Sequence, residues 1–355
     1  MVTQEQISWS NYDVYEGPFF RGTARYKPAV APTLNDLILE VITATEGGAW
    51  NAINMYDRCI CTVGLIQWCE GGQYSVSDML GVLAERGSGL DPLGSVMQDA
   101  RVNFRRNARG KWRFHFNDKR GEVDTLEEQR AMFFGGASGK KGDWQSFERG
   151  FAKNWAAALA TVYESPEAIA SQRDYTVPRL YGFAVHLARS WLDRPEAKTT
   201  QIGQAFTCAY LSFAANNPRR AGEALGNAAT SWTDEPWTID WLVHVLRHLT
   251  FDSGVTIYPH RYNAIRPVLE RRFGVNLPDH SNELAGLLST GQIQTILVHK
   301  LGYDLGKSGP AGDGVDGAWG PKSKAALADF ERRRGFEQSD GLPDKATNEA
   351  LLKVA

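Results

Sequence analysis

A short motif occurs twice near the C-terminus, and the two copies are 24 residues apart. Each copy has an Asp-Gly pair, a hydroxyl residue six positions after the glycine, and an alanine and a leucine three and four positions further on. The copies are Asp316-Gly317 with Ser323, Ala326 and Leu327, and Asp340-Gly341 with Thr347, Ala350 and Leu351. A turn followed by a hydroxyl N-cap and an apolar helix start predicts one helix per copy. With a helical pattern from Ile293 to Leu301, this predicts a three-helix bundle over residues 289–355, after a polar linker at 276–288.

The same segment resembles the three-helix peptidoglycan-binding domains of bacterial and phage wall hydrolases. The matching stretches are LGYDLG at 301–306, DGAWGPKSKAALADF at 316–330 and DGLPDKATNEALL at 340–352. The chain departs from the family in an insertion, GKSGPAGD, that lengthens the loop before the first Asp-Gly turn. The resemblance implies a groove that binds bacterial peptidoglycan near Asp316, Gly317 and Trp319. Turn geometry and core packing account for these three residues equally well.

Residues 1–275 carry mainly helical patterns and are predicted to form one large domain. Two short β-prone runs on either side of Asp57-Arg58 favour a small hairpin, and the alternating KWRFHF at 111–116 favours another hairpin strand. Residues 1–32 show no clear period and are predicted to be an irregular arm. Helical spacing of apolar residues occurs at 144–163, 178–191, 202–215 and 237–250. The expected fold class is therefore mainly α, with a small β-hairpin region and a separate three-helix bundle.

One glutamate, Glu46, stands where the first helical pattern stops. The pattern starts near Leu34 and Gly47-Gly48 interrupts it, so Glu46 is predicted to close a helix. The negative end of the helix dipole disfavours a carboxylate ion and thereby favours the protonated form that a proton donor needs. Gly64-Leu65-Ile66-Gln67 follows the predicted hairpin, and Ser77 beyond it is predicted to cap the next helix.

Glu46, the hairpin and Gly64-Leu65-Ile66-Gln67 together resemble the superfamily of soluble lytic transglycosylases and goose-type lysozymes. Ile66 replaces the usual methionine. A weaker match is Phe213 to Asn217, which lacks the family's tyrosine and its following glycine. The resemblance implies a lysozyme-like domain that cleaves the β-1,4 bond between N-acetylmuramic acid and N-acetylglucosamine, as a muramidase or a lytic transglycosylase. Glu46 would be its general acid.

The resemblance also implies roles for residues near Glu46. In a hydrolase, Asp57 would activate the attacking water, whereas a transglycosylase needs no second acid. Alternatively, Asp57 is simply a turn residue. Glu70, which precedes another glycine pair, competes with Glu46 for the role of acid. The residues expected to line the sugar cleft are Tyr56, Gly64, Gln67, Trp68 and Asn217, with Trp50 as a further ring that could stack on a sugar.

Two other classes of function stay open. A zinc-dependent amidase or peptidase of the wall would use His244 and His248, four residues apart, and a third ligand such as His260. The glutamate of the H-E-x-x-H motif is absent, and packed histidines explain the same spacing. The other class is a wall-anchored structural or adhesive protein without activity, whose large domain only binds. The favoured interpretation, a glycosidase, requires no metal or cofactor.

Charge and hydropathy limit the expected partners. The net charge is −2, and no apolar run approaches the ~18 residues that a membrane span needs, so we expect neither nucleic acid nor a membrane span. Basic clusters at Arg105-Arg106 and Arg332–Arg334 are predicted to be solvated helix faces.

The N-terminus shows no secretory signal pattern, so we expect synthesis in the cytoplasm and action on the wall. A monomeric phage endolysin fits these expectations, with a bacterial autolysin or exported effector as the alternative.

The four cysteines show neither a C-x-x-C pair nor a zinc-ribbon spacing. Cytoplasmic synthesis favours buried, reduced thiols. A bridge from Cys59 or Cys61 to Cys69 is the alternative, and it would stiffen the predicted hairpin.

Overall fold

The computed structural model describes the whole chain except residues 13, 47, 72–73, 88, 185, 253–257, 280–287, 289, 310–311, 318, 337–338, 342, 344 and 355. The described part is mainly helical, which confirms the expected fold class. It divides into two compact units, Met1–Arg179 and Leu180–Ala355. This boundary lies inside one helix, α6 (Pro166–Phe183), and within the segment that the sequence predicts as a single domain. Within the described ranges, no helix is both long and apolar enough to cross a membrane.

The first unit contains a five-stranded antiparallel sheet whose strands follow chain order. The strands are β1 (Ser8–Tyr12), β2 (Tyr15–Phe20), β3 (Ile53–Asn54), β4 (Thr62–Val63) and β5 (Trp68–Cys69). The β3–β4 hairpin is present as predicted, with shorter strands. The prediction of an irregular arm over residues 1–32 is wrong, because β1 and β2 pair along their whole length. Pro18 and the surrounding aromatic residues conceal the alternation of this hairpin in the sequence.

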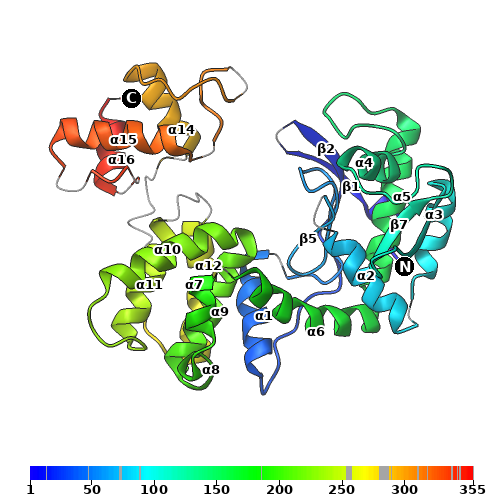
Figure 1. Cartoon of the computed structure of the whole chain (residues 1–355), viewed down its shortest axis with the longest axis horizontal. Coiled ribbons are helices and arrows are strands. Elements are labelled where there is room, and N and C mark those ends of the chain that lie inside the picture. Colours follow the sequence, from blue (N-terminus) through cyan, green and yellow to red (C-terminus); the bar gives the residue numbers. More distant parts are fainter. Residues whose placement is uncertain are drawn as a thin grey trace. The chain divides into compact units, whose positions relative to one another are not determined.

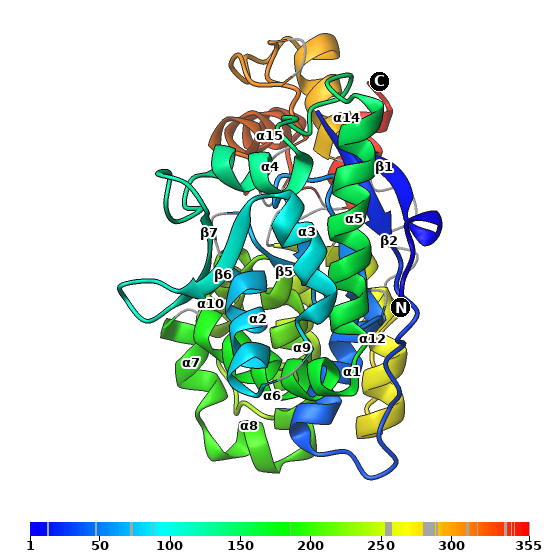
Figure 2. The ribbon, with the colours of Figure 1, turned by 90° about the vertical axis from the view of Figure 1, so that its right-hand side faces the viewer.

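Helix α5 (Ser146–Tyr163) is the centre of the first unit. It packs against β2, β3, β4 and the helices α3 and α4, and Figure 2 shows it running beside α3 and the β1–β2 hairpin. Trp155 on α5 is fully buried, with its ring against those of Phe114 and Phe133. The surrounding helices are α1 (Leu34–Glu46), α2 (Ser75–Glu85), α3 (Gly94–Asp99) and α4 (Leu126–Phe134), with 3-10 turns at Gln4–Gln6 and Asp91–Leu93.

A second, two-stranded sheet projects from the first unit (Figure 2). It consists of β6 (Val102–Arg106) and β7 (Trp112–Phe116), so the strand predicted at KWRFHF is confirmed. Arg105 and Arg106 lie on β6, and the prediction of a helix face there is wrong. The end of the hairpin next to the connection packs closely on α2, because Gly81 faces Trp112, the first residue of β7, and a Cβ at Gly81 would lie 2.6 Å from the indole ring.

The second unit starts with a group of helices around α9 (Gln201–Asn216). The residues of α9 from Ala205 to Ala214 are all buried, and the helix contacts α8, α10, α11 and α12 (Figure 1). Phe206 on α9 packs against the ring of Trp241. The other helices are α7 (His186–Leu192), α8 (Pro195–Thr199), α10 (Pro218–Ser231), α11 (Ile239–Phe251) and α12 (Tyr258–Phe273).

The C-terminal segment of the second unit has its own apolar core. Its helices are α14 (Thr290–Thr295), continued by a π-helical turn at Ile296–Lys300, α15 (Pro321–Arg334) and α16 (Lys345–Leu352). Ile293, Leu297, Leu327 and Leu351 are buried together in this core. Arg332–Arg334 lie in the last turn of α15, where the helix dipole stabilises positive charges. Most of the predicted linker, 276–288, lies outside the described residues.

The cysteines differ from the favoured expectation. Cys59 and Cys69 form a disulfide with their Cα atoms 5.4 Å apart, which joins the β3–β4 connection to β5. Cys61 and Cys208 are free and buried. The prediction of four reduced thiols is therefore wrong for one pair, and the alternative bridge to Cys69 is present from Cys59.

We expect Cys59→Ser with Cys69→Ser to lower the free energy of unfolding by about 3 kcal/mol, because the bridge restricts the unfolded chain. The measurement is the thermal midpoint with and without dithiothreitol. Dithiothreitol should lower the midpoint of the natural chain and leave that of the double variant unchanged. Equal midpoints of both proteins without reductant would contradict a stabilising role of the bridge.

Candidate active site

Glu46 is the last residue of α1 and its side chain is half-buried. Helix α1 is fixed by an apolar face on which Ile38, Val41 and Ile42 are fully buried. Beyond the helix, the backbone of Gly48 accepts a hydrogen bond from Tyr26, and the amide of Trp50 donates to Ala24. The chain therefore ends α1 at Glu46, as predicted, and turns at once into an ordered segment that leads to β3.

Gln172, on α6, connects this segment to the Gly64–Gln67 turn between β4 and β5. Its fully buried side chain donates from Nε2 to the Trp50 carbonyl at 3.0 Å and accepts at Oε1 from the Leu65 amide at 3.2 Å. Gly64 has a φ of +85°, and a Cβ there would lie 2.3 Å from Gln172 Oε1. Only glycine fits this position, for both conformational and steric reasons. Gln172 thus holds the turn against the chain that follows Glu46, a contact that no local sequence pattern indicates.

Gln67 ends the turn with a φ of +55° and a half-buried side chain. Its Oε1 accepts from Thr62 Oγ1 at 2.9 Å, and its Nε2 donates to the Gly64 carbonyl at 3.1 Å. The amide therefore stabilises the turn. A bound sugar would have to share or replace these bonds to contact Gln67.

Asp57 and Tyr56 occupy the β3–β4 connection. The Asp57 carboxylate accepts from Asn54 Nδ2 at 2.9 Å and from the Cys59 amide at 2.8 Å, which is typical of a turn residue. Burial raises the pKa of Asp57, and the two hydrogen bonds oppose this rise. Tyr56 is half-buried with its ring edge-on to Phe19, and burial raises its pKa as well.

The two predicted stacking tryptophans lie in the core. Trp50 is 2% exposed and Trp68 is 3% exposed, and the ring of Trp68 packs edge-on against Tyr175. Neither indole has an open face for a sugar, so we assign both to the core instead of the cleft. Asn217 belongs to the second unit, where its side chain caps α10 by accepting from the Arg220 amide.

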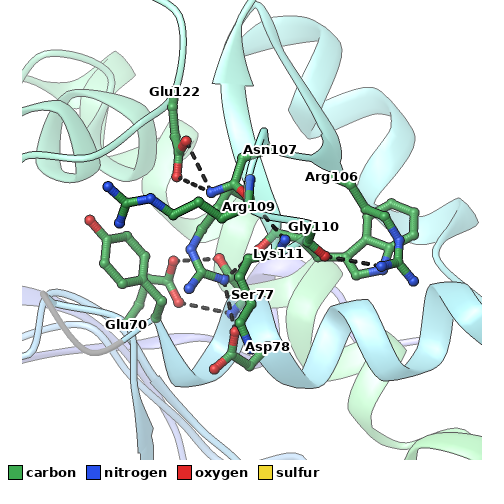
Figure 3. A network of polar contacts seen from close by, with 12 residues as sticks. Glu70, Ser77, Asp78, Arg106, Asn107, Arg109, Gly110, Lys111 and Glu122 are labelled. Atoms are coloured by element: carbon green, nitrogen blue, oxygen red, sulfur yellow. Dashed lines mark hydrogen bonds and ion pairs between the residues drawn. The ribbon is translucent and has the colours of Figure 1, made fainter.

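Glu70, the competitor of Glu46, is fully enclosed. Its carboxylate accepts from the Ser77 amide at 2.9 Å and from Ser77 Oγ at 2.5 Å, as Figure 3 shows. Burial is the main cause that raises the pKa of Glu70 to about 7. Both oxygens thus face the first turn of α2, which begins at Ser75 with Tyr74 as N-cap. Ser77 is therefore not the N-cap that the sequence predicts, and Glu70 is best explained as a helix-start acceptor.

The histidines of α11 form a different arrangement from a zinc site. His244 Nε2 and His248 Nε2 lie 3.1 and 3.3 Å from Ser231 Oγ, and His248 Nδ1 bonds to Asp252. His260, the third predicted ligand, lies on α12 and is exposed. In the part of the chain that the structure describes, no group of three or more His, Cys, Asp or Glu side chains could hold a metal ion.

In the C-terminal segment, one buried residue supports each Asp-Gly turn. Gln294 accepts at Oε1 from the amides of Asp316 and Gly317 and donates from Nε2 to Asp316 and Ser323. In the second copy Glu331 accepts from the Gly341 amide and from Thr347 Oγ1. Asp316 and Gly317 stay exposed, whereas Trp319 is 8% exposed and belongs to the core. The repeat therefore encodes two equivalent turns, and only Asp316 and Gly317 of the predicted ligand contacts face solvent.

Comparison with protein families decides the nature of this segment. Residues 290–351 match the family described as "Putative peptidoglycan binding domain". The chain carries a peptidoglycan-binding module. The match covers the module alone and does not extend to the first unit. No curated protein and no solved structure matches the chain.

Proposed function

We propose that the protein cleaves the glycan of bacterial peptidoglycan, as a muramidase or a lytic transglycosylase, with Glu46 as the general acid. The observation that carries the proposal is the peptidoglycan-binding module at 290–351, which indicates the polymer on which the rest of the chain acts. Support comes from the placement of Glu46, half-buried at a helix end, next to a segment that Gln172 ties to the Gly64–Gln67 turn. An endolysin and a bacterial autolysin both fit this activity.

In the proposed reaction, Glu46 donates its proton to the glycosidic oxygen as the bond from that oxygen to C1 of the muramic acid breaks. In a hydrolase, a water molecule then adds to C1 and loses a proton to a base. In a transglycosylase, the sugar's own C6 hydroxyl attacks C1, loses its proton to the Glu46 carboxylate and closes a 1,6-anhydro ring. Asp57 already accepts two hydrogen bonds in its turn, so the route without a second carboxylate requires less rearrangement.

The test uses the full chain on purified, insoluble wall material, with turbidity as the readout and mass spectrometry of the products. We expect turbidity to fall equally with and without EDTA, and the products to carry either a reducing muramic acid or its 1,6-anhydro form. Loss of activity in EDTA would favour the zinc amidase instead. No fall in turbidity, together with normal wall binding, would favour a structural protein.

Deleting residues 288–355 is expected to weaken binding to insoluble wall by at least about tenfold, because the module supplies an additional attachment to the same polymer. Cleavage of soluble glycan fragments should change little. The measurements are co-sedimentation with wall and product release from soluble fragments. Unchanged co-sedimentation of a folded deletion variant would show that the module is not the anchor.

A further inference from the structure

The β6–β7 hairpin concentrates positive charge in a chain that is slightly acidic overall. Residues 101–120 contain eight lysines and arginines against one aspartate, a net charge of +7, whereas the whole chain carries −2. Seven of the eight cations are exposed, and Arg113 is half-buried. Such a local field attracts anions even where the net charge of the protein does not.

The arrangement of these charges opposes folding of the hairpin. Arg105 and Arg113 lie directly opposite each other in the register of β6 and β7. Like charges directly opposite each other on neighbouring strands destabilise the pairing. Arg113 is balanced by Asp78 at 2.8 Å, but within the described ranges no ion pair forms at Arg105, nor at Arg109 and Lys111 in the connection between the strands. Repulsion between exposed cations that no ion pair offsets is typical of a binding surface.

A hollow of about 360 Å³ lies where the hairpin meets α2 and α6. Its cations on the hairpin are Arg106 and Lys111, and its aromatic walls are Trp112 and Tyr175. Figure 3 shows Arg106, Gly110 and Lys111 together at this end of the hairpin, with Arg106 Nη1 donating to the Gly110 carbonyl at 3.0 Å. The site therefore combines aromatic side chains, which sugars can contact, with cations that bind carboxylates.

The hollow lies next to residues that pack beside the Gly64–Gln67 turn. Tyr175, one of its walls, packs against Trp68 at a centroid distance of 5.3 Å, and Trp68 directly follows Gln67. The hollow and the Gly64–Gln67 turn are therefore linked through one aromatic contact. All of these residues belong to the first unit.

We propose that the hollow and the hairpin connection bind a carboxylate-bearing part of the wall glycan, such as the lactyl and stem-peptide groups of muramic acid. The identity of the ligand rests on the proposed function. Two acids, Asp78 and Glu85, also line the hollow, and Glu85 already pairs with Arg106 at 2.7 Å. These acids repel a densely charged polyphosphate more than they repel single carboxylates separated by neutral sugars, so the surface fits a carboxylated glycan better than nucleic acid.

The test uses the full chain with Glu46→Gln, so that the ligand is not consumed. The probe is a soluble disaccharide–tetrapeptide fragment of peptidoglycan, compared with the same fragment after methyl esterification of its carboxyl groups. Arg109→Glu with Lys111→Glu should raise the Kd of the free-acid fragment by about three- to tenfold in calorimetry. Lys140→Glu with Lys141→Glu, an exposed pair in the same unit, is the matched control and should change the Kd less than twofold. The fragment should also slow hydrogen exchange over residues 102–116.

Three results would each overturn the proposal. The first is an equal loss of affinity in both charge-reversal variants, and the second is an undiminished affinity for the esterified fragment. The third is unchanged hydrogen exchange over the hairpin. Tighter binding of a single-stranded oligonucleotide or of anionic lipid vesicles at the hairpin would assign the surface to another partner. A hairpin that binds the free-acid fragment in a chain that fails to clear wall would overturn the proposed cleavage alone. Wall clearance with no effect of Arg109→Glu and Lys111→Glu on fragment binding would overturn this proposal alone.

Discussion

Replacing Glu46 with glutamine is expected to lower the rate of wall clearance by about 10²–10⁴-fold, the usual contribution of a general acid. Glutamine keeps the size of the side chain and its hydrogen-bonding capacity but has no proton to donate to the leaving oxygen. The fold should survive, because Glu46 is only half-buried at the end of α1. The measurement is the initial rate of turbidity loss, with circular dichroism and co-sedimentation with wall on the same preparation.

Two further substitutions control for this result. Glu70→Gln, a second glutamate of the same segment, should retain most of the activity because Glu70 is enclosed behind Ser77. Asp57→Asn should reduce the rate strongly only if Asp57 activates water, so it separates hydrolase from transglycosylase. If Glu46→Gln clears wall at the natural rate while Glu70→Gln does not, the proton donor is Glu70 and the assignment of Glu46 is wrong.

The second large effect is a loss of stability with rising pH, and it originates in Glu70. Burial raises the pKa of Glu70 from 4.5 to about 7 in the folded chain, so the folded state binds the proton more tightly than the unfolded state. The associated stabilisation, about 3 kcal/mol, is complete below pH 4.5 and is lost as the pH rises through 7. Above that pH the protein must either bury a carboxylate ion or unfold locally.

Denaturant unfolding at pH 5 and pH 8 measures this effect. Other groups titrate in the same range, so the quantity to compare is the difference between the natural chain and Glu70→Gln. Glutamine resembles the protonated acid and can still bond to Ser77, so the natural chain should lose about 2–3 kcal/mol more than the variant between the two pH values. Parallel pH profiles of the two proteins would show that Glu70 is not the responsible group.

Local signals in the sequence predicted the parts of the fold that depend on neighbouring residues. Gly47-Gly48 indicated the end of α1 and hence the position of Glu46, and the alternation in KWRFHF indicated β7. The Asp-Gly repeat indicated the helices α15 and α16. A helix boundary predicted at a proline is wrong. The helical pattern at 178–191 begins at Pro178, but Pro178 lies inside α6.

The candidate site depends on contacts between distant residues, and these were not predictable. Gln172 lies 107 residues from Leu65, whose amide it binds, and no pattern in the sequence connects the two. The roles of Trp50 and Trp68 illustrate the same limit, since an aromatic ring beside a predicted cleft can face either the sugar or the core. Burial decides between these roles, and burial depends on packing of the whole unit.

The contact between Gly81 and Trp112 separates the hairpin into two parts with different tolerance to substitution. At Trp112, the strand residue beside the connection, the absence of a side chain at Gly81 lets the indole lie directly on α2, and any larger residue at Gly81 would displace the indole. At the tip, Arg109 and Lys111 project into solvent. The charges of Arg109 and Lys111 can therefore be exchanged without disturbing the contact at Gly81 that holds the hairpin on α2.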